Sequence, residues 1–185
     1  MCYLSVAVGL YPSVLGASFN ELSPVVRAFH VGGRSLRARG VFAVQHSRFW
    51  IGRVLVRLAG LPRAGDGVDV RLEVRATARG ERWSRIFGGV AMVSEQWQDG
   101  GHIVERVGTT EVRFALVNEQ GALVFRQVRH ALRLGPLRLP LPSFLAVRVS
   151  ARVHEEHGAM VSDIRMEAPV LGLILRYSGR LEVVT

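Results

Sequence analysis

The sequence predicts a mainly β (α+β) fold: an antiparallel, strongly bent sheet or lipocalin-like β-barrel of about nine strands with two N-terminal helices. From residue 68 onward, apolar and polar residues alternate with a period of two, which is the pattern of half-buried strands. Glycine-containing turn signals separate these strands at intervals too short for the crossover helices that parallel strands need. Many consecutive antiparallel strands with one apolar face tend to curl into a barrel.

The chain of 185 residues is about the size of one domain. Its hydrophobic fraction of 49% excludes an intrinsically disordered protein. No internal repeat, low-complexity tract or linker divides it. We therefore expect a single domain over residues 1–185.

Helical signals dominate the N-terminal third. Ser18 is positioned to cap a helix that runs to Phe29, with Glu21 three residues later at the capping-box position. Gly32 and Gly33 end this helix. His30 at its last turn is a favourable C-terminal cation.

A first strand is expected over Ser35–Gln45, followed by a second amphipathic helix from Phe49 to Leu61. That helix ends at Gly60 and Pro62. Its expected apolar face consists of Ile51, Val54, Leu55 and Leu58.

After Pro62 the period changes to two, and apolar residues alternate with polar ones from Val68 to Arg79. The turn signals predict further strands at about 81–87, 90–97, 102–107, 110–118, 122–134, 145–156, 159–167 and 173–184.

The net charge of +9 comes entirely from arginine, because the chain has no lysine. Clustered arginines would indicate a polyanion such as a nucleic acid. Here Arg71, Arg75 and Arg79 alternate with apolar residues, which is typical of a solvated outer strand face. We therefore expect no nucleic-acid partner; an accessory protein whose arginine-rich face docks an acidic partner stays an alternative.

Cys2 is the only cysteine, so the chain can form neither an internal disulfide nor a thiolate metal cluster. The apolar run from Met1 to Leu10 lacks a basic n-region and is far shorter than the roughly 20 residues that a membrane span needs. We expect a soluble cytoplasmic protein with no transmembrane segment.

Four histidines, at positions 102, 130, 154 and 157, lack metal-ligand spacing. They are interpreted as surface or satisfied side chains. The glycine-rich segment after the first helix lacks the GxGxxG and P-loop patterns, and no GxSxG elbow occurs. The sequence thus predicts no metal site and no cofactor.

Two charged residues fall on strand faces that are otherwise apolar. Arg85 lies between Trp83 and Phe87 on one face, and Glu105 lies between two β-branched residues on another. A charge buried in such surroundings is costly unless it is paired. Because the two strands are separated by one intervening strand, we expect Arg85 and Glu105 to pair inside the barrel.

Two roles for this pair remain open. It is either a polar anchor or acid–base group in an apolar cavity, with Glu105 as the catalytic candidate, or an ion pair that fixes strand register. Tyr177 lies on the apolar face of the last strand, so its phenol is expected to point inward, and Gly179 beside it leaves room for a ligand or a backbone.

The run from Leu134 to Leu145 combines leucines with Pro136, Pro140 and Pro142. Prolines exclude a regular central strand. A tight apolar loop across one end of the barrel is expected, with a patch for a partner or a membrane surface as the alternative.

Several segments together resemble a known family. They are Glu81-Arg-Trp-Ser-Arg-Ile-Phe-Gly-Gly89, Val104-Glu-Arg-Val-Gly108, Leu139-Pro-Leu-Pro-Ser-Phe-Leu145 and Gly172-Leu-Ile-Leu-Arg-Tyr-Ser-Gly-Arg-Leu181. They look like the bacterial domain of unknown function family 4166, over residues 11–181. The resemblance brings no established activity; members fused to membrane or dehydrogenase-like modules imply a small-molecule setting.

The leading hypothesis is a barrel that binds a small apolar or amphipathic ligand. The expected ligand-binding residues are Trp83, Arg85, Phe87, Arg106 and Tyr177. The alternative on the same scaffold is an isomerase, cyclase or hydratase that uses Glu105 as acid or base.

Overall fold

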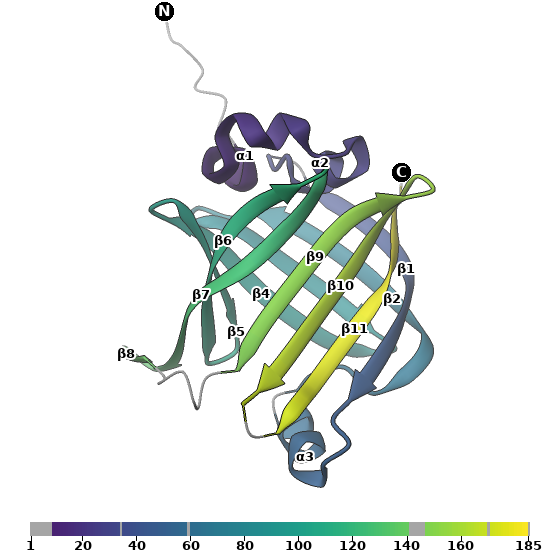
Figure 1. Cartoon of the computed structure of the whole chain (residues 1–185), viewed down its shortest axis with the longest axis vertical. Coiled ribbons are helices and arrows are strands. Elements are labelled where there is room, and N and C mark those ends of the chain that lie inside the picture. The colour runs from purple at the N-terminus through teal and green to yellow at the C-terminus, as the bar shows by residue number, and fades with distance from the viewer. Residues whose placement is uncertain (1–8, 34, 59, 141–146, 170, 185) are drawn as a thin grey trace, which may run out of the picture.

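Ten antiparallel strands close into a barrel in the computed structural model of the chain (Figure 1). The structure describes residues 9–33, 35–58, 60–140, 147–169 and 171–184. The barrel strands are β1 (Leu36–His46), β2 (Gly65–Ala76), β3 (Gly80–Phe87), β4 (Val90–Asp99), β5 (His102–Val107), β6 (Thr110–Glu119), β7 (Ala122–Leu134), β9 (Arg148–Glu156), β10 (Ala159–Ala168) and β11 (Gly172–Val183). The mainly β, barrel-forming prediction is confirmed, with ten barrel strands where about nine were expected.

The strand order is β6-β5-β4-β3-β2-β1-β11-β10-β9-β7, and pairing of β6 with β7 closes the ring. Most neighbours in space are neighbours in sequence, and short turns join them except for β1 and β2, whose connection contains a helix. The exceptions are β1–β11, which joins the two ends of the chain, and β7–β9. Alternate residues of each strand therefore face one shared interior.

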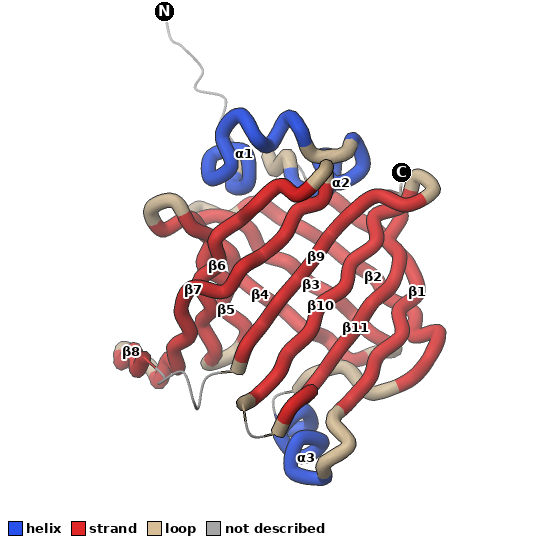
Figure 2. Tube along the Cα trace, in the orientation of Figure 1, coloured by secondary structure: helices blue, strands red, loops and turns tan. Residues whose placement is uncertain are grey.

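Helices lie at both ends of the barrel (Figure 2). At one end lie α1 (Leu10–Leu15), the 3₁₀ helix η1 (Gly16–Glu21) and α2 (Pro24–His30), whereas α3 (Trp50–Leu58) lies at the other. None of the helices in the described part of the chain is both long and apolar enough to cross a membrane.

The prediction of one capped helix from Ser18 to Phe29 is wrong in its details. Ser18 lies inside η1 and caps nothing, and α2 begins separately at Pro24. Proline has no backbone N–H and a fixed φ, so it suits the first turn of a helix and disrupts an interior. The helix α1 was not predicted.

Helix α3 confirms the second predicted helix but not its whole apolar face. Val54 is 44% exposed, and Val56 is the buried side chain at 2%. Val56 also joins the cavity wall described below. The other three residues of the predicted face, Ile51, Leu55 and Leu58, have side chains outside the described part of the chain.

The proline-rich segment begins as a strand and not as a loop across the barrel end. β8 (Leu137–Pro140) pairs with the end of β7 and forms a hairpin that projects from the barrel (Figure 1). β8 is the last strand in the sheet order, and an edge strand tolerates proline because one side needs no ladder bond. Residues 141–145 of the predicted loop, including Pro142, lie outside the described residues.

The barrel has a short seam between β7 and β9. Their ladder runs only from Leu123, opposite Val153, to Arg126, opposite Ser150. Beyond it, the Gln127 side chain donates to the Val147 carbonyl at 3.0 Å and accepts from the Val149 N–H at 2.5 Å. A side-chain amide thus replaces backbone pairing where the two strands diverge.

Gly179 allows β1 and β11 to approach closely. A Cβ at this position would lie 2.2 Å from the Val41 carbonyl oxygen and 2.5 Å from Cγ of Phe42, which is directly opposite. The room expected beside Tyr177 is therefore taken by the Phe42 ring and not by a ligand.

We expect Gly179→Ala to destabilise the barrel by about 1–3 kcal/mol, because the added methyl group overlaps the neighbouring backbone and ring. Gly101→Ala is the matched control, since a Cβ there meets nothing within 4 Å and φ is not positive. Urea unfolding of both variants measures the difference. Equal stability of the two variants would contradict the close approach.

Candidate functional site

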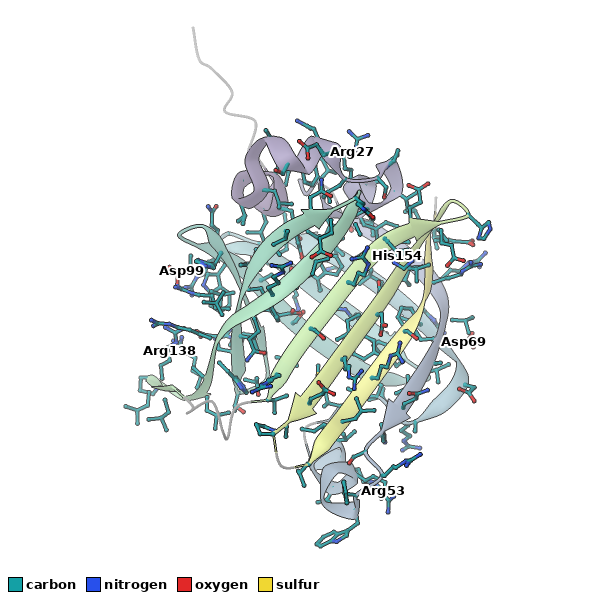
Figure 3. The ribbon with its side chains drawn as sticks, viewed as in Figure 1. Arg27, Arg53, Asp69, Asp99, Arg138 and His154 are labelled. Carbon is teal, nitrogen blue, oxygen red and sulfur yellow. The ribbon has the colours of Figure 1, made fainter. Side chains whose placement is uncertain are left out.

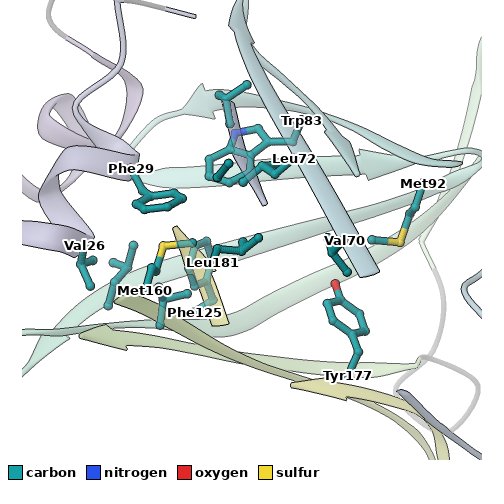
Figure 4. Packing of buried hydrophobic residues seen from close by; sticks show 14 of the residues in the cluster. Val26, Phe29, Val70, Leu72, Trp83, Met92, Phe125, Met160, Tyr177 and Leu181 are labelled. Carbon is teal, nitrogen blue, oxygen red and sulfur yellow. The ribbon is translucent and has the colours of Figure 1, made fainter. Parts of the chain in front are cut away.

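The barrel encloses a cavity of about 370 Å³. Its walls are mainly apolar, and Figure 4 shows Val70, Met92, Trp83 and Tyr177 directed from different strands toward one interior. Such a volume lies at the lower end of the range of about 300–1,000 Å³ that is typical of small-molecule sites.

Exposure of the wall changes along the barrel. Lining residues near α1 and α2 are buried, including Tyr11, His30, Trp83 and Phe125. Lining residues near the opposite end are half-buried, including Val107, Thr110, Val147 and Val149. Among the described residues, the cavity is therefore most accessible at the end away from α1 and α2.

The predicted pairing of Arg85 and Glu105 is confirmed. Nη2 of Arg85 lies 3.7 Å from Oε1 of Glu105, and the side chains are 17% and 20% exposed. Arg85 also donates from Nη1 to the Ser94 hydroxyl at 2.9 Å, on the intervening strand β4. Both charges line the cavity, so each is partly neutralised by the other in an apolar wall.

Trp83 and Phe87 flank Arg85 on the inner face of β3, as their alternation predicts. The Arg85 guanidinium carbon lies 5.2 Å from the centre of the Trp83 ring. Phe87 packs edge-on against Tyr177 with a distance of 5.3 Å between ring centres. Both aromatic rings form cavity wall.

Tyr177 points into the barrel as expected (Figure 4) and is 6% exposed. Burial raises the pKa of Tyr177 to about 12. The phenol is therefore un-ionised at neutral pH and available as a hydrogen-bond donor.

Arg106 is the one predicted site residue that does not reach the cavity. It follows Glu105 on β5, so its side chain points outward and pairs with Glu95. Its guanidinium carbon lies 5.9 Å from the centre of the Trp97 ring. The strict alternation of a strand places neighbours on opposite faces, which was the signal against including Arg106.

Further polar side chains, which the sequence analysis did not identify, lie in the interior between Arg85 and α1. The Tyr11 hydroxyl donates to Oε1 of Gln96 at 2.6 Å. Nε1 of Trp83 donates to Oε2 of Glu81 at 3.0 Å. Burial raises the pKa of Glu81 and holds that of Tyr11 well above its usual value.

The expectation that His30 is a C-terminal helix cation is wrong. The ring is buried against Tyr11, 4.5 Å between centres, and Trp83, 5.5 Å. Its Nδ1 contacts the Val26 carbonyl oxygen at 2.8 Å. Burial lowers the pKa of His30 to about 4, so the ring is neutral at pH 7.

His130 is a second cavity residue that sequence reasoning missed. It lies on β7, lines the cavity and is 7% exposed. Burial lowers its pKa. The interpretation of His130 as a surface histidine is wrong, because the ring is buried, and no described residue hydrogen-bonds to either ring nitrogen.

The outer face carries the arginines predicted there, and many meet carboxylates. Glu73 contacts both Arg37 and Arg75, and Glu119 contacts both Arg126 and Arg152. Figure 3 shows the labelled Asp69, Asp99 and Arg138 on the outside of the barrel. No cluster of three potential metal ligands occurs within the described ranges.

One family model matches, described as "Domain of unknown function (DUF4166)", over residues 22–181. The chain belongs to this family. The resemblance expected over 11–181 is thereby confirmed for most of its length. No curated protein and no solved structure matches the chain, so the finer prediction of a lipocalin-like barrel stays a prediction.

We expect Arg85→Met in this DUF4166 domain to lower the free energy of unfolding by on the order of 2 kcal/mol, because Glu105 is left unpaired in an apolar wall. Adding Glu105→Gln should recover part of that loss. A double-mutant cycle by denaturant unfolding measures the coupling. The exposed pair Arg165–Glu167 is the matched control, and coupling no larger than in that pair would contradict a buried interaction.

Stability should also decrease in acid because of His30. Its pKa is about 4 in the folded chain and 6.5 in the reference state, so the unfolded chain binds more protons between these values. The contribution of neutral His30 to the free energy of unfolding is fully present above pH 6.5. It is lost as the pH falls toward 4, by on the order of 3 kcal/mol. Denaturant unfolding across this range should show a shallower pH dependence for His30→Phe than for the exposed control His157→Gln. Equal slopes would show that His30 titrates normally.

Proposed function

We propose that this domain binds a small apolar or amphipathic molecule inside the barrel. The observation that supports this proposal is a cavity of about 370 Å³ with apolar walls, into which a paired arginine and glutamate project. Apolar walls supply affinity through burial, and a few polar groups orient the ligand. Arg85, Glu105 and Tyr177 are the orienting groups, and Trp83 and Phe87 are aromatic wall.

The arrangement of helices supports this proposal. The end of the cavity under α1 and α2 is sealed by side chains that hydrogen-bond to one another, as Tyr11 does to Gln96. Half-buried lining residues such as Thr110, Val147 and Val149 lie at the end away from these helices. A ligand would therefore enter at the end away from α1 and α2 and place its apolar part against the aromatic residues.

Ala151→Trp tests the proposal, because Ala151 lines the cavity on β9 and a tryptophan would occupy much of its volume. The uncharged fluorophore N-phenyl-1-naphthylamine should bind the wild-type protein with enhanced emission. Its affinity should fall about tenfold or more in Ala151→Trp, which corresponds to about 1.4 kcal/mol. Native mass spectrometry of the purified protein should show a co-purifying small molecule that the variant lacks.

Ala115→Trp is the control, because alternation from the cavity residue Phe114 places Ala115 on the outer face of β6. Equal fluorophore affinity in wild type and both variants would mean that the probe binds outside the barrel, and the proposal would fail.

A second candidate function is acid–base catalysis of the isomerase, cyclase or hydratase type. The observation that favours it is that a carboxylate and a guanidinium, Glu105 and Arg85, both line the cavity 3.7 Å apart, where both could contact a substrate. With the co-purified molecule as substrate, Glu105→Gln separates the two functions. Turnover lost with affinity retained indicates an enzyme, and affinity lost in step indicates a binding protein.

A further inference from the structure

His130 lines a part of the cavity that is separate from the Arg85–Glu105 pair. Both of its ring nitrogens are buried, and within the described ranges neither has a hydrogen-bond partner. The ring is 7% exposed and forms part of the cavity wall. Buried polar groups in folded proteins are almost always hydrogen-bonded, and the ring lies where a molecule in the cavity could supply the missing partner.

Strand register fixes where His130 lies relative to Glu105. Glu105 on β5 is directly opposite Val112 on β6, and Val112 is directly opposite His130 on β7. The three side chains form one row on the inner wall. Thr110 lies two residues from Val112 on the same inner face, toward the accessible end, and its side chain also lines the cavity. His130 and Thr110 therefore form a polar region separated from Glu105 by a valine.

The chemistry of this region is that of uncharged groups. Because burial lowers the pKa of His130, the ring is neutral at pH 7 and offers one donor and one acceptor. The Thr110 hydroxyl also donates and accepts. The positive charge of Arg85 is already opposed by Glu105, so the described cavity wall has no unopposed cation for an acidic ligand.

We propose that His130 and Thr110 form a subsite for a ligand hydroxyl group, so that the bound molecule is an apolar alcohol. A hydroxyl group can donate to the acceptor nitrogen of an imidazole and accept from another donor, whereas a carboxylate or an ether can only accept. The apolar part of the alcohol occupies the aromatic and aliphatic wall. This inference rests on the proposed function of small-molecule binding.

Three matched probes test the subsite: 1-octanol, its methyl ether 1-methoxyoctane, and octanoate. Each displaces N-phenyl-1-naphthylamine from the wild-type protein if it binds the cavity. We expect octanol to bind about tenfold more tightly than the ether, as one buried hydrogen bond would provide. Octanoate should bind more weakly than octanol.

His130→Leu should remove the preference for octanol over the ether and leave ether affinity within about twofold of wild type. This variant replaces unpartnered polar atoms with apolar ones, so it should fold, and thermal unfolding checks that it does. His157→Gln on the outer surface is the matched control and should retain the preference. In wild-type protein labelled with ¹⁵N-histidine, octanol should shift the ring nitrogens of His130, which the variant spectrum assigns.

The possible failures are distinguishable. If none of the three probes displaces the fluorophore, the proposed binding function fails and the subsite fails with it. If octanol and the ether bind equally well, or if the His130 resonances do not move, the cavity binds small molecules but His130 does not recognise them. If octanoate binds most tightly, the ligand is an acid and the assignment of an alcohol is overturned.

Discussion

Closure of ten strands into one barrel is the constraint on which the other features depend. Barrel diameter grows with the number of strands, and about eight strands enclose an interior that side chains can just fill. Ten strands enclose more. Here large aromatic residues and Tyr11 from α1 take part of the additional space, and a cavity of about 370 Å³ remains. The cavity is thus a geometric result of strand number, whatever molecule occupies it.

The interior is divided into two polar regions that differ in their hydrogen bonding. Near α1 and α2, Tyr11 meets Gln96 and Trp83 meets Glu81, so each of these four side chains makes a hydrogen bond within the protein, although Oε1 of Glu81 has no partner among the described residues. Toward the opposite end, His130 has no such partner among the described residues. The first region fixes the helices onto the barrel, which makes that end a structural seal. Polar recognition is left to the middle and the accessible end of the cavity.

Sequence periodicity was sufficient for the barrel and for part of the site. Alternation correctly placed Arg85 and Glu105 inside because β3 and β5 have regular pairing with β4. The same alternation placed Arg106 outside, and its inclusion came from the family pattern alone. Periodicity is reliable only where a strand has no irregularity.

His130 and His30 show where that reasoning stops. The β6–β7 register shifts between Arg113 and Phe114, opposite Val128, so the inward phase of β7 changes from odd to even positions. Strict alternation from Phe125, which points inward, would therefore predict that His130 points outward. No feature of the sequence marks the bulge. The burial of His30 depends on how α2 docks onto the barrel, which is a tertiary contact that local helix signals do not report.

The seam between β7 and β9 has fewer backbone hydrogen bonds than the rest of the barrel wall. Elsewhere, neighbouring barrel strands are joined by longer ladders, but these two share a short ladder continued by the amide of Gln127. Local opening of a protein occurs first where few backbone hydrogen bonds must break. The β7–β9 seam is thus the part of the barrel wall that the fewest ladder pairs hold together. Because Val147 and Val149 also line the cavity at its accessible end, a fluctuation of this seam would widen that same opening.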